Sequence, residues 1–279
     1  MYTENQSIRD RVAANGALIA AHRGTSGANV IQNTSLAYKN ALLHGADMVE
    51  MDASMTVDGV FYAFHNGEEM LEFGVSGDIR EMTSREAGKL VPLNGIRHET
   101  KQRLERVKDV LEGLRGKCLI NIDRSWFYWK EILLLLAQMD MKDQILLKSG
   151  VEENLLKELA DSATGIMYMP ILKSTAEWET VKRYDVNVAA AELIFEDMDS
   201  DFLKPAFMGE LKAAGIVPWV NAITLDDDTV LSGLLDDNHA ISDGFDGTWG
   251  KLVDLGFEII QTDWPAPLKG YLTHRFGHK

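Results

Sequence analysis

Four ionisable side chains in the first quarter of the chain are spaced so that they can act together: His22, Glu50, Asp52 and His65. Glu50 and Asp52 are two residues apart, and on a strand such residues point to the same face. Two carboxylates on one face repel each other unless a cation neutralises them. Because oxygen ligands suit hard ions, the pair predicts a Mg²⁺ or Ca²⁺ site. The alternative is an ordinary strand end with one carboxylate in solvent.

A short hairpin is expected to bring His65 to this pair. Asp58-Gly59 is a strong signal for a two-residue turn, in which Val57 would face Val60. Continuing that pairing along both strands places Asp52 opposite His65, on the same face of the hairpin. The sequence therefore predicts an imidazole beside the carboxylates.

Two imidazoles beside a divalent cation suit the cleavage of a phosphodiester. One imidazole removes a proton from the nucleophile, and the other protonates the leaving oxygen. Arg23, which follows His22, is the nearest arginine and offers a guanidinium fork to phosphoryl oxygens. A structural salt bridge is the alternative role for Arg23.

Eight β-rich runs alternate with amphipathic segments along the chain and would position these groups. The runs are 17–22, 48–55, 118–123, 144–148, 165–169, 187–191, 216–220 and 258–262. Helical stretches are expected at 34–43, 103–114, 129–139, 152–159, 175–183, 205–214 and 249–255. This rhythm predicts an α/β fold, a (β/α)8 TIM barrel formed by residues 1–279 as a single domain. An open doubly wound sheet is the alternative, but its glycine-rich fingerprint is absent.

The carboxyl ends of the strands form the mouth of such a barrel, where active sites lie. The first predicted strand ends at His22 and the third at Asp123, while a regular strand would point Arg124 to the other face. Residues 66–102 do not fit the rhythm. We expect this insertion after the second strand to form a lid over the mouth.

These residues resemble the glycerophosphodiester phosphodiesterase family. The matching motifs, in chain order, are His22-Arg23-Gly24, Asn33-Thr34, Glu50-Met51-Asp52, Asp58-Gly59 with His65, Trp219-Val220-Asn221 and Thr262-Asp263-Trp264-Pro265. In the family they correspond to an H-R-G opening, a P-E-N-T stretch, an E-x-D pair, a hairpin leading to H-D, a W-x-x-N stretch and a final T-D-x-P. The ordered set spans most of the chain.

The resemblance implies a role for each matching residue. His22 and His65 would be the catalytic acid–base pair, and Arg23 would bind phosphate. The metal ligands would be Glu50, Asp52 and Asp123, and Trp219 would stand in the pocket wall. Family members cleave glycerophosphodiesters to glycerol 3-phosphate and an alcohol, through attack by the neighbouring glycerol hydroxyl and a cyclic phosphate.

Several positions depart from the family pattern. Gln32 replaces the glutamate of P-E-N-T, Asn66 replaces the aspartate of H-D, and Asp123 and Ser125 stand where the family has E-x-K. Lys148, at the end of the fourth predicted strand, would restore the missing positive charge and bind phosphate. Two alternatives stay open: an enzyme that releases the cyclic phosphate, and a barrel that binds phosphate esters without turnover.

Composition limits the partners of the chain. It carries 28 basic and 43 acidic residues, a net charge of −15, which disfavours nucleic acid and anionic membranes. We expect a small phosphodiester as the substrate. The longest strongly apolar run, 132–137, is too short to span a bilayer. Met1 to Asn15 lacks the apolar segment of a secretion signal, so a cytoplasmic protein is predicted unless such a signal was trimmed.

Overall fold

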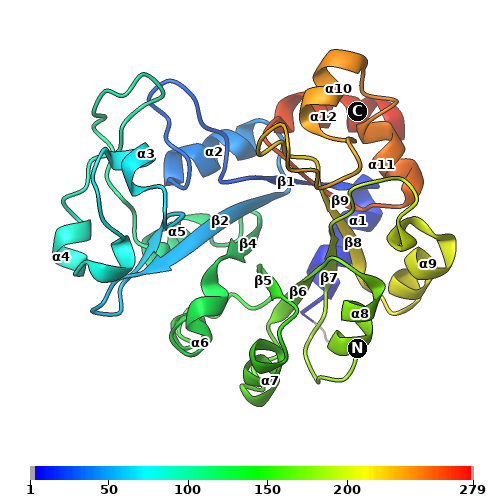
Figure 1. The fold of residues 1–279 in the computed structure, drawn as a ribbon, viewed down its shortest axis with the longest axis horizontal. Helices are drawn as coiled ribbons and strands as arrows, with labels where there is room; N and C mark the ends of the chain where they lie inside the picture. The colour runs from blue at the N-terminus through cyan, green and yellow to red at the C-terminus, as the bar shows by residue number, and fades with distance from the viewer. Residues whose placement is uncertain (1–3, 278–279) are drawn as a thin grey trace.

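The computed structural model describes residues 4–277, which form a closed barrel of parallel strands (Figure 1). The strands are β1 (Leu18–Ala21), β2 (Met48–Met55), β4 (Leu119–Asp123), β5 (Ile145–Gly150), β6 (Met167–Leu172), β7 (Ala190–Leu193), β8 (Val217–Asn221) and β9 (Ile259–Thr262). β1 pairs with both β2 and β9, which closes the barrel. The predicted (β/α)8 class is confirmed, and each predicted strand overlaps one of these eight.

Helices surround the barrel and cover its outer face. They are α2 (Ser35–Leu43), α5 (Val107–Leu114), α6 (Trp129–Ala137), α7 (Glu153–Asp161), α8 (Thr175–Val181), α9 (Pro205–Ala213), α10 (Asp237–Asp243), α11 (Trp249–Leu255) and α12 (Pro265–Phe276), with short 3-10 turns at η2 (Ser125–Tyr128) and η3 (Asp201–Leu203). Local signals fix several starts. The Thr34 hydroxyl accepts the Ala37 N–H at the start of α2, and Pro205 occupies the first turn of α9. All seven predicted helices are present, whereas α10 and α12 were not predicted.

The interior of the barrel is a packed apolar layer. Alternate strand residues point inward, and this layer includes Leu18, Ala20, Met48, Leu119, Leu146, Met167, Met169, Ala190, Val217, Trp219 and Ile259. Helix α1 (Gln6–Asn15) adds the fully buried Ile8 to the same cluster, so it contributes to this core. Because the layer leaves no open channel, a site has room only above it, at the carboxyl ends of the strands.

The hairpin after β2 has a different register from the predicted one. β3 (Phe61–Ala63) pairs Met55 with Phe61 and Ala53 with Ala63. The turn has three loop residues rather than two, because the Gly59 N–H bonds the Thr56 carbonyl and Gly59 adopts a φ of +80°. The predicted pairing of Asp52 with His65 is therefore wrong by one residue: the Phe64 N–H donates to the Asp52 carbonyl, 3.1 Å away.

Residues 66–102 form a small lateral unit. It contains α3 (Glu69–Phe73), η1 (Ile79–Glu81) and α4 (Ser84–Ala87). Its own apolar cluster packs on the hairpin and consists of Tyr62, Phe64, Phe73, Ile79 and Ala87. Figure 1 shows the unit to the side of the barrel, beyond the tip of β2, rather than across the mouth where a lid was expected.

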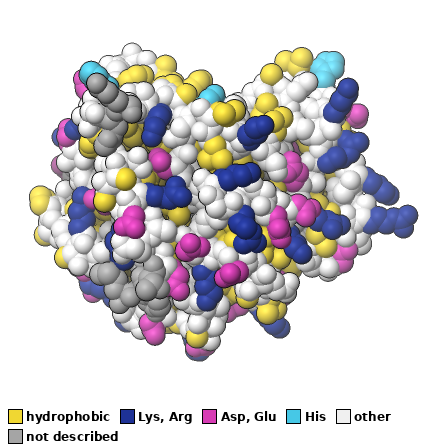
Figure 2. Space-filling model, turned by 180° about the vertical axis from the view of Figure 1, so that it is seen from behind, with side chains coloured by type: hydrophobic (Ala, Val, Ile, Leu, Met, Phe, Trp, Pro, Cys, Tyr) yellow, Lys and Arg dark blue, Asp and Glu magenta, His cyan; other side chains and the backbone are white. Residues whose placement is uncertain are grey.

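Charges of both signs are mixed on one face of the molecule (Figure 2). Figure 2 shows basic and acidic side chains interspersed over the face that it displays. The net charge of −15 is therefore not segregated into one acidic block on that face.

None of the helices among residues 4–277 is long and apolar enough to cross a membrane.

Candidate active site

A cavity of about 660 Å³ opens at the carboxyl ends of the barrel strands. Its floor comes from inward-facing residues that lie above the apolar interior, because residues two apart on a strand share a face. We call these residues the polar belt: His22, Asp52, Asp123, Lys148, Glu192, Asn221 and Gln261. His65 also lines the cavity. The structure thus brings both predicted histidines, Arg23 and the predicted carboxylates to one place.

Three carboxylates form a cluster at one side of this cavity. Glu50 and Asp52 lie on one face of β2, and the parallel register sets Asp52 beside Asp123 of β4. One oxygen from each of Glu50, Asp52 and Asp123 lies within 4.8 Å of the others. Burial, and then the neighbouring Asp52, raise the pKa of Glu50 to about 7. A crowded, buried set of carboxylate oxygens fits a hard divalent cation, which would relieve this repulsion.

Arg23 is clamped against this cluster. It adopts a left-handed φ of +53°, which lets its backbone N–H donate to Glu50 Oε2 at 2.9 Å. Its Nε lies 3.0 Å from Asp52 Oδ2, and its Nη1 lies 2.8 Å from Glu68 Oε1. Burial disfavours the Asp52 carboxylate, but the Arg23 guanidinium, His65 and the Asn33 hydrogen bond together outweigh burial and lower the pKa of Asp52. Arg23 lines the cavity while it bridges two carboxylates.

Asn33 orients Asp52 from below. Its Nδ2 donates to Asp52 Oδ2 at 2.9 Å, and its Oδ1 accepts the Asp52 N–H and the Tyr38 hydroxyl. The adjacent Gln32 faces the lateral unit instead. Its Nε2 lies 2.9 Å from Glu68 Oε2 and 2.9 Å from Glu72 Oε1. Two glutamates of the lateral unit thus lie beside position 32.

Contacts with neighbouring carboxylates orient His22 and favour its protonated form. Its Nδ1 lies 2.9 Å from Asp263 Oδ1, which leaves Nε2 available to a ligand in the cavity. Burial alone would lower the pKa of His22. The hydrogen bond with Asp263 and the nearby Glu50 carboxylate overcome burial, so the pKa of His22 is raised above its ordinary value.

His65 has the opposite electrostatic setting. It reaches the cavity because the chain leaves β3 at Ala63, and its Nδ1 lies 3.5 Å from Glu68 Oε1. Burial, together with the positive charges of Arg23 and Arg124, lowers the pKa of His65 despite the attraction of Asp52. Near neutral pH, His65 is the imidazole suited to accept a proton, and His22 is the one suited to donate it.

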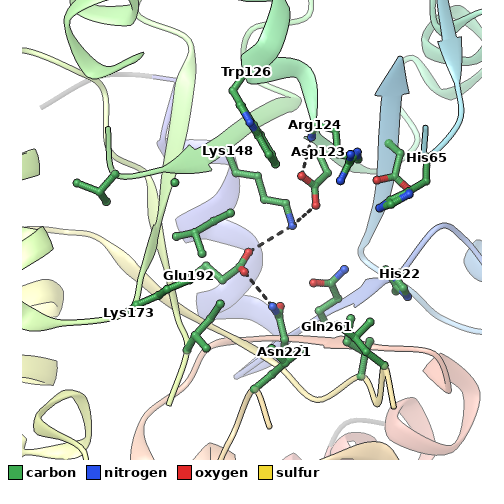
Figure 3. A pocket seen from close by; sticks show the side chains of 18 of the residues that line it. His22, His65, Asp123, Arg124, Trp126, Lys148, Lys173, Glu192, Asn221 and Gln261 are labelled. Atoms are coloured by element: carbon green, nitrogen blue, oxygen red, sulfur yellow. Dashed lines mark hydrogen bonds and ion pairs between the residues drawn. The ribbon is translucent and has the colours of Figure 1, made fainter. Parts of the chain in front are cut away.

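A chain of polar contacts crosses the floor of the cavity (Figure 3). Lys148 Nζ lies 2.7 Å from Asp123 Oδ2 and 3.3 Å from Glu192 Oε2. Asn221 Nδ2 donates to Glu192 Oε1 at 2.9 Å, and Trp219 Nε1 donates to Asn221 Oδ1 at 2.7 Å. These carboxylates outweigh burial and raise the pKa of Lys148, so it remains an ammonium.

Trp219 does not line the cavity, in contrast to the expectation that it forms the pocket wall. It is fully buried in the apolar layer of the barrel, two residues before Asn221 on β8. Because the two side chains share a face, the amide stands one layer higher and meets the cavity. Trp219 contacts the site through its hydrogen bond to Asn221.

Sequence reasoning missed Arg124 as a residue of the site. Arg124 has a φ of +58°, which ends the regular strand and turns its side chain into the cavity. Its Nε donates to Asn66 Oδ1 at 3.0 Å. The Asn66 amide carries no charge, so this hydrogen bond does not itself neutralise the guanidinium. Glycine is the usual sequence signal for a left-handed turn, and this turn has an arginine in that position, so the sequence did not indicate it.

Comparison with known proteins points to one family. The model of the glycerophosphoryl diester phosphodiesterase family matches residues 22–217, and a model described as a domain of unknown function matches residues 168–272. A curated glycerophosphodiester phosphodiesterase from Caldanaerobacter subterraneus is 31% identical over 144 residues, 52% of this chain and 53% of that protein. A second, from Bacillus altitudinis, is 31% identical over 108 residues, 38% of this chain and 44% of that protein. The matches thus span about half the length of these relatives.

Solved structures share the fold over nearly the whole chain. A glycerophosphoryl diester phosphodiesterase from Parabacteroides distasonis superposes with a TM-score of 0.74 at 15% identity, covering 93% of this chain and 87% of that one. An Oleispira antarctica phosphodiesterase, solved in complex with its product sn-glycerol-3-phosphate, gives a TM-score of 0.67 at 16% identity and covers 92% and 98%. At these identities the likeness establishes the barrel.

Proposed function

Because the chain belongs to the glycerophosphoryl diester phosphodiesterase family, we propose that it hydrolyses glycerophosphodiesters to glycerol 3-phosphate and an alcohol in a cation-dependent reaction. The observation that carries this proposal is the pair of histidines with opposite pKa shifts lining one cavity with a carboxylate cluster. Pairs of titratable groups driven apart in pKa are typical of acid–base catalysis. The naming of curated relatives as glycerophosphodiester phosphodiesterases supports the same substrate class.

Glu50, Asp52 and Asp123 are the residues that would hold Mg²⁺ or Ca²⁺. A cation bound there supplies positive charge that neutralises the phosphoryl oxygens and the acidic surroundings. Asn33 and Arg23 fix the orientation of Asp52, and Lys148 fixes Asp123. The cluster is thereby preorganised by side chains around it.

Each histidine carries out one of the two proton transfers. His65, whose pKa is lowered, takes the proton from the attacking hydroxyl, and His22, whose pKa is raised, gives a proton to the leaving oxygen through Nε2. Asp263 holds the His22 ring at Nδ1 during this transfer. For a cyclic intermediate, the two histidines would exchange roles when water opens the ring.

Three basic side chains line the part of the cavity where a phosphate would bind. Arg23 and Lys148 were expected to bind it, and both line the cavity, although each already faces two carboxylates. Arg124 adds a guanidinium that is bonded to the neutral Asn66 side chain. We therefore assign the main contact to phosphoryl oxygens to Arg124, with Arg23 and Lys148 neutralising the surrounding carboxylates.

Phosphorus NMR of a panel of glycerophosphodiesters tests the proposal. We expect turnover to glycerol 3-phosphate with Mg²⁺ or Ca²⁺, none with excess chelator, and a loss of about 10²- to 10⁴-fold in His22→Ala. A cyclic phosphate as the final product would instead support the alternative of an enzyme that releases the cyclic phosphate. Absence of turnover on every diester, with folded protein and either cation, would contradict the proposed activity.

A further inference from the structure

The cavity changes character above the polar belt on the β8 side. Trp219 lies in the apolar interior, and Asn221, two residues further, lies in the polar belt. Ile223 and Leu225, at the next two alternate positions, also line the cavity. Ile223 is 6% exposed, whereas Leu225 is 54% exposed at the rim. This line of side chains runs from the apolar interior through the polar belt to a second apolar layer.

Strand β7 repeats this layering, and β6 adds an apolar side chain with no polar layer beneath it. On β7, Glu192 belongs to the polar belt, and Ile194, two residues later, lines the cavity above it. On β6, Met169 belongs to the interior, and Ile171 stands above it in the cavity. Ile171, Ile194 and Ile223 thus place apolar side chains in the cavity from three adjacent strands, and the charged Lys173 follows at the rim of β6.

We call this layer the apolar wall. It consists of Val151, Ile171, Ile194, Ile223, Leu225 and Leu231, which follow or end strands β5 to β8. The histidines and the carboxylate cluster come from the opposite side of the barrel, at β1, β2, β3 and β4. In Figure 3, His22 and His65 lie on one side of the pocket, and Glu192 and Lys173 come from the other.

A phosphate bound between these sides has one ester substituent directed toward the apolar wall. A small charged head group would lose hydration against the wall itself, and would find charged partners only at its edge, where Glu152 and Lys173 also line the cavity. The carboxylate of Glu177, at the rim, already accepts a hydrogen bond from the Ser174 N–H, as part of the capping box at the start of α8. An aliphatic chain, by contrast, would be removed from water along the wall and could extend past Leu225 to the surface.

We propose that the preferred substrates are phosphodiesters that carry an aliphatic chain beside the phosphate, with the chain lying on the apolar wall. This rests on the proposed phosphodiesterase activity and specifies its substrate class. The chain enters either as the leaving alcohol or as a substituent of the glycerol, since both place it next to the phosphate.

A homologous series measures the wall directly. The substrates are glycerol phosphate esters of straight-chain alcohols from methyl to octyl, compared with glycerophosphocholine and with short 1-alkyl glycerophosphocholines. We expect kcat/KM to rise about fourfold for each methylene that the wall buries, and then to level off. The two arms distinguish a chain on the alcohol from a chain on the glycerol.

Two variants place an amide on the wall. Ile194→Asn and Leu225→Asn should flatten the dependence on chain length, and the exposed position of Leu225 makes the second variant safe for folding. Leu134→Asn is the matched control because Leu134 is 58% exposed on α6 and does not line the cavity. It should leave the chain-length dependence as it is in the unaltered protein.

Calorimetric binding of butyl, hexyl and octyl phosphate with Mg²⁺ gives a readout that needs no turnover. Affinity that rises with chain length, and falls in Leu225→Asn, supports the wall even if every diester resists hydrolysis, which would count against the proposed activity alone. Rates and affinities that are flat or fall with chain length overturn this inference, and turnover of the polar diesters would leave the proposed activity standing.

Discussion

At the scale of single residues, Asp263 sets the behaviour of His22. Their 2.9 Å contact is the main contribution that, with the Glu50 carboxylate, raises the pKa of His22 against the effect of burial. Asp263→Asn removes that charge, so the pKa of His22 should fall. Because the proposed acid must be protonated, the alkaline limb of the kcat/KM profile should move to lower pH. The acid limb, set by His65, should stay in place, and an unmoved alkaline limb would refute the role given to His22.

Arg124 makes a separate prediction about phosphate binding. Its guanidinium enters the cavity and is bonded to a neutral amide, so it is free to contact an anion. Arg124→Met should raise KM about tenfold, as for one lost charge-assisted hydrogen bond, with little change in kcat. Arg103→Met, an exposed arginine outside the cavity, serves as the control. Equal KM values for the two variants would exclude Arg124 from the phosphate site.

Residue types and spacing were sufficient to predict which histidines and carboxylates meet. Glu50 and Asp52 share a face because strand periodicity is strict, and the structure places Asp123 beside them as expected. Arg124 was not predicted as a site residue because its left-handed backbone conformation reverses the side of the strand on which its side chain projects. Trp219 and Asn221 share a face, so periodicity alone does not reveal which of them reaches the cavity.

At the scale of elements, the strands were predictable and the hairpin register was not. Eight apolar runs identify eight barrel strands because both faces of each strand are buried. The register of β3 depends instead on whether the turn at Asp58-Gly59 has two or three loop residues, and both turns accept the same sequence. His65 still reaches the site because it lies beyond the end of β3.

Helix α10 is tied to the end of β9 by a buried carboxyl group. Asp237 accepts hydrogen bonds from the Thr262 hydroxyl and the Asp263 N–H, and burial raises its pKa to about 7. Between about pH 4 and pH 7 the folded protein keeps a proton that the unfolded chain releases, so this group's contribution to stability is lost as pH rises.

The consequence is a measurable slope. Asp237→Asn should make the fall in the free energy of unfolding from pH 4 to pH 7 shallower, by up to about 4 kcal/mol across the window. Urea unfolding of both proteins at several pH values gives this difference, and parallel curves would show that Asp237 does not titrate as described.

The lateral unit docks on the barrel through Gln32. A glutamate at this position would face Glu68 and Glu72 without the amide hydrogens that now bond them. Gln32→Glu should therefore destabilise the docking by about 1–3 kcal/mol at pH 7 and speed hydrogen exchange in residues 66–74. At pH 5 protonation of the carboxyl groups should reduce the effect. Unchanged exchange at pH 7 would show that this contact does not hold the unit.

At the scale of the whole molecule, the barrel is organised in layers. An apolar interior closes the centre, a polar belt lies above it, and one side of the mouth ends in the apolar wall. The rule that residues two apart share a face generates all three layers from single strands. Strand periodicity predicted that Glu50 and Asp52 share a face, but the order of strands around the closed barrel was needed to separate the acid–base side from the apolar side.

A change of leaving group tests the central assignment most directly. The measurement compares turnover of glycerophosphocholine and of the p-nitrophenyl ester of glycerol phosphate by the unaltered protein, His22→Ala and His65→Ala. Nitrophenolate leaves without a proton, so His22→Ala should lose most of its activity on the choline ester and recover on the nitrophenyl ester, whereas His65→Ala should be impaired on both. Equal impairment of His22→Ala on both esters, or no turnover of either by the unaltered protein, would contradict this account.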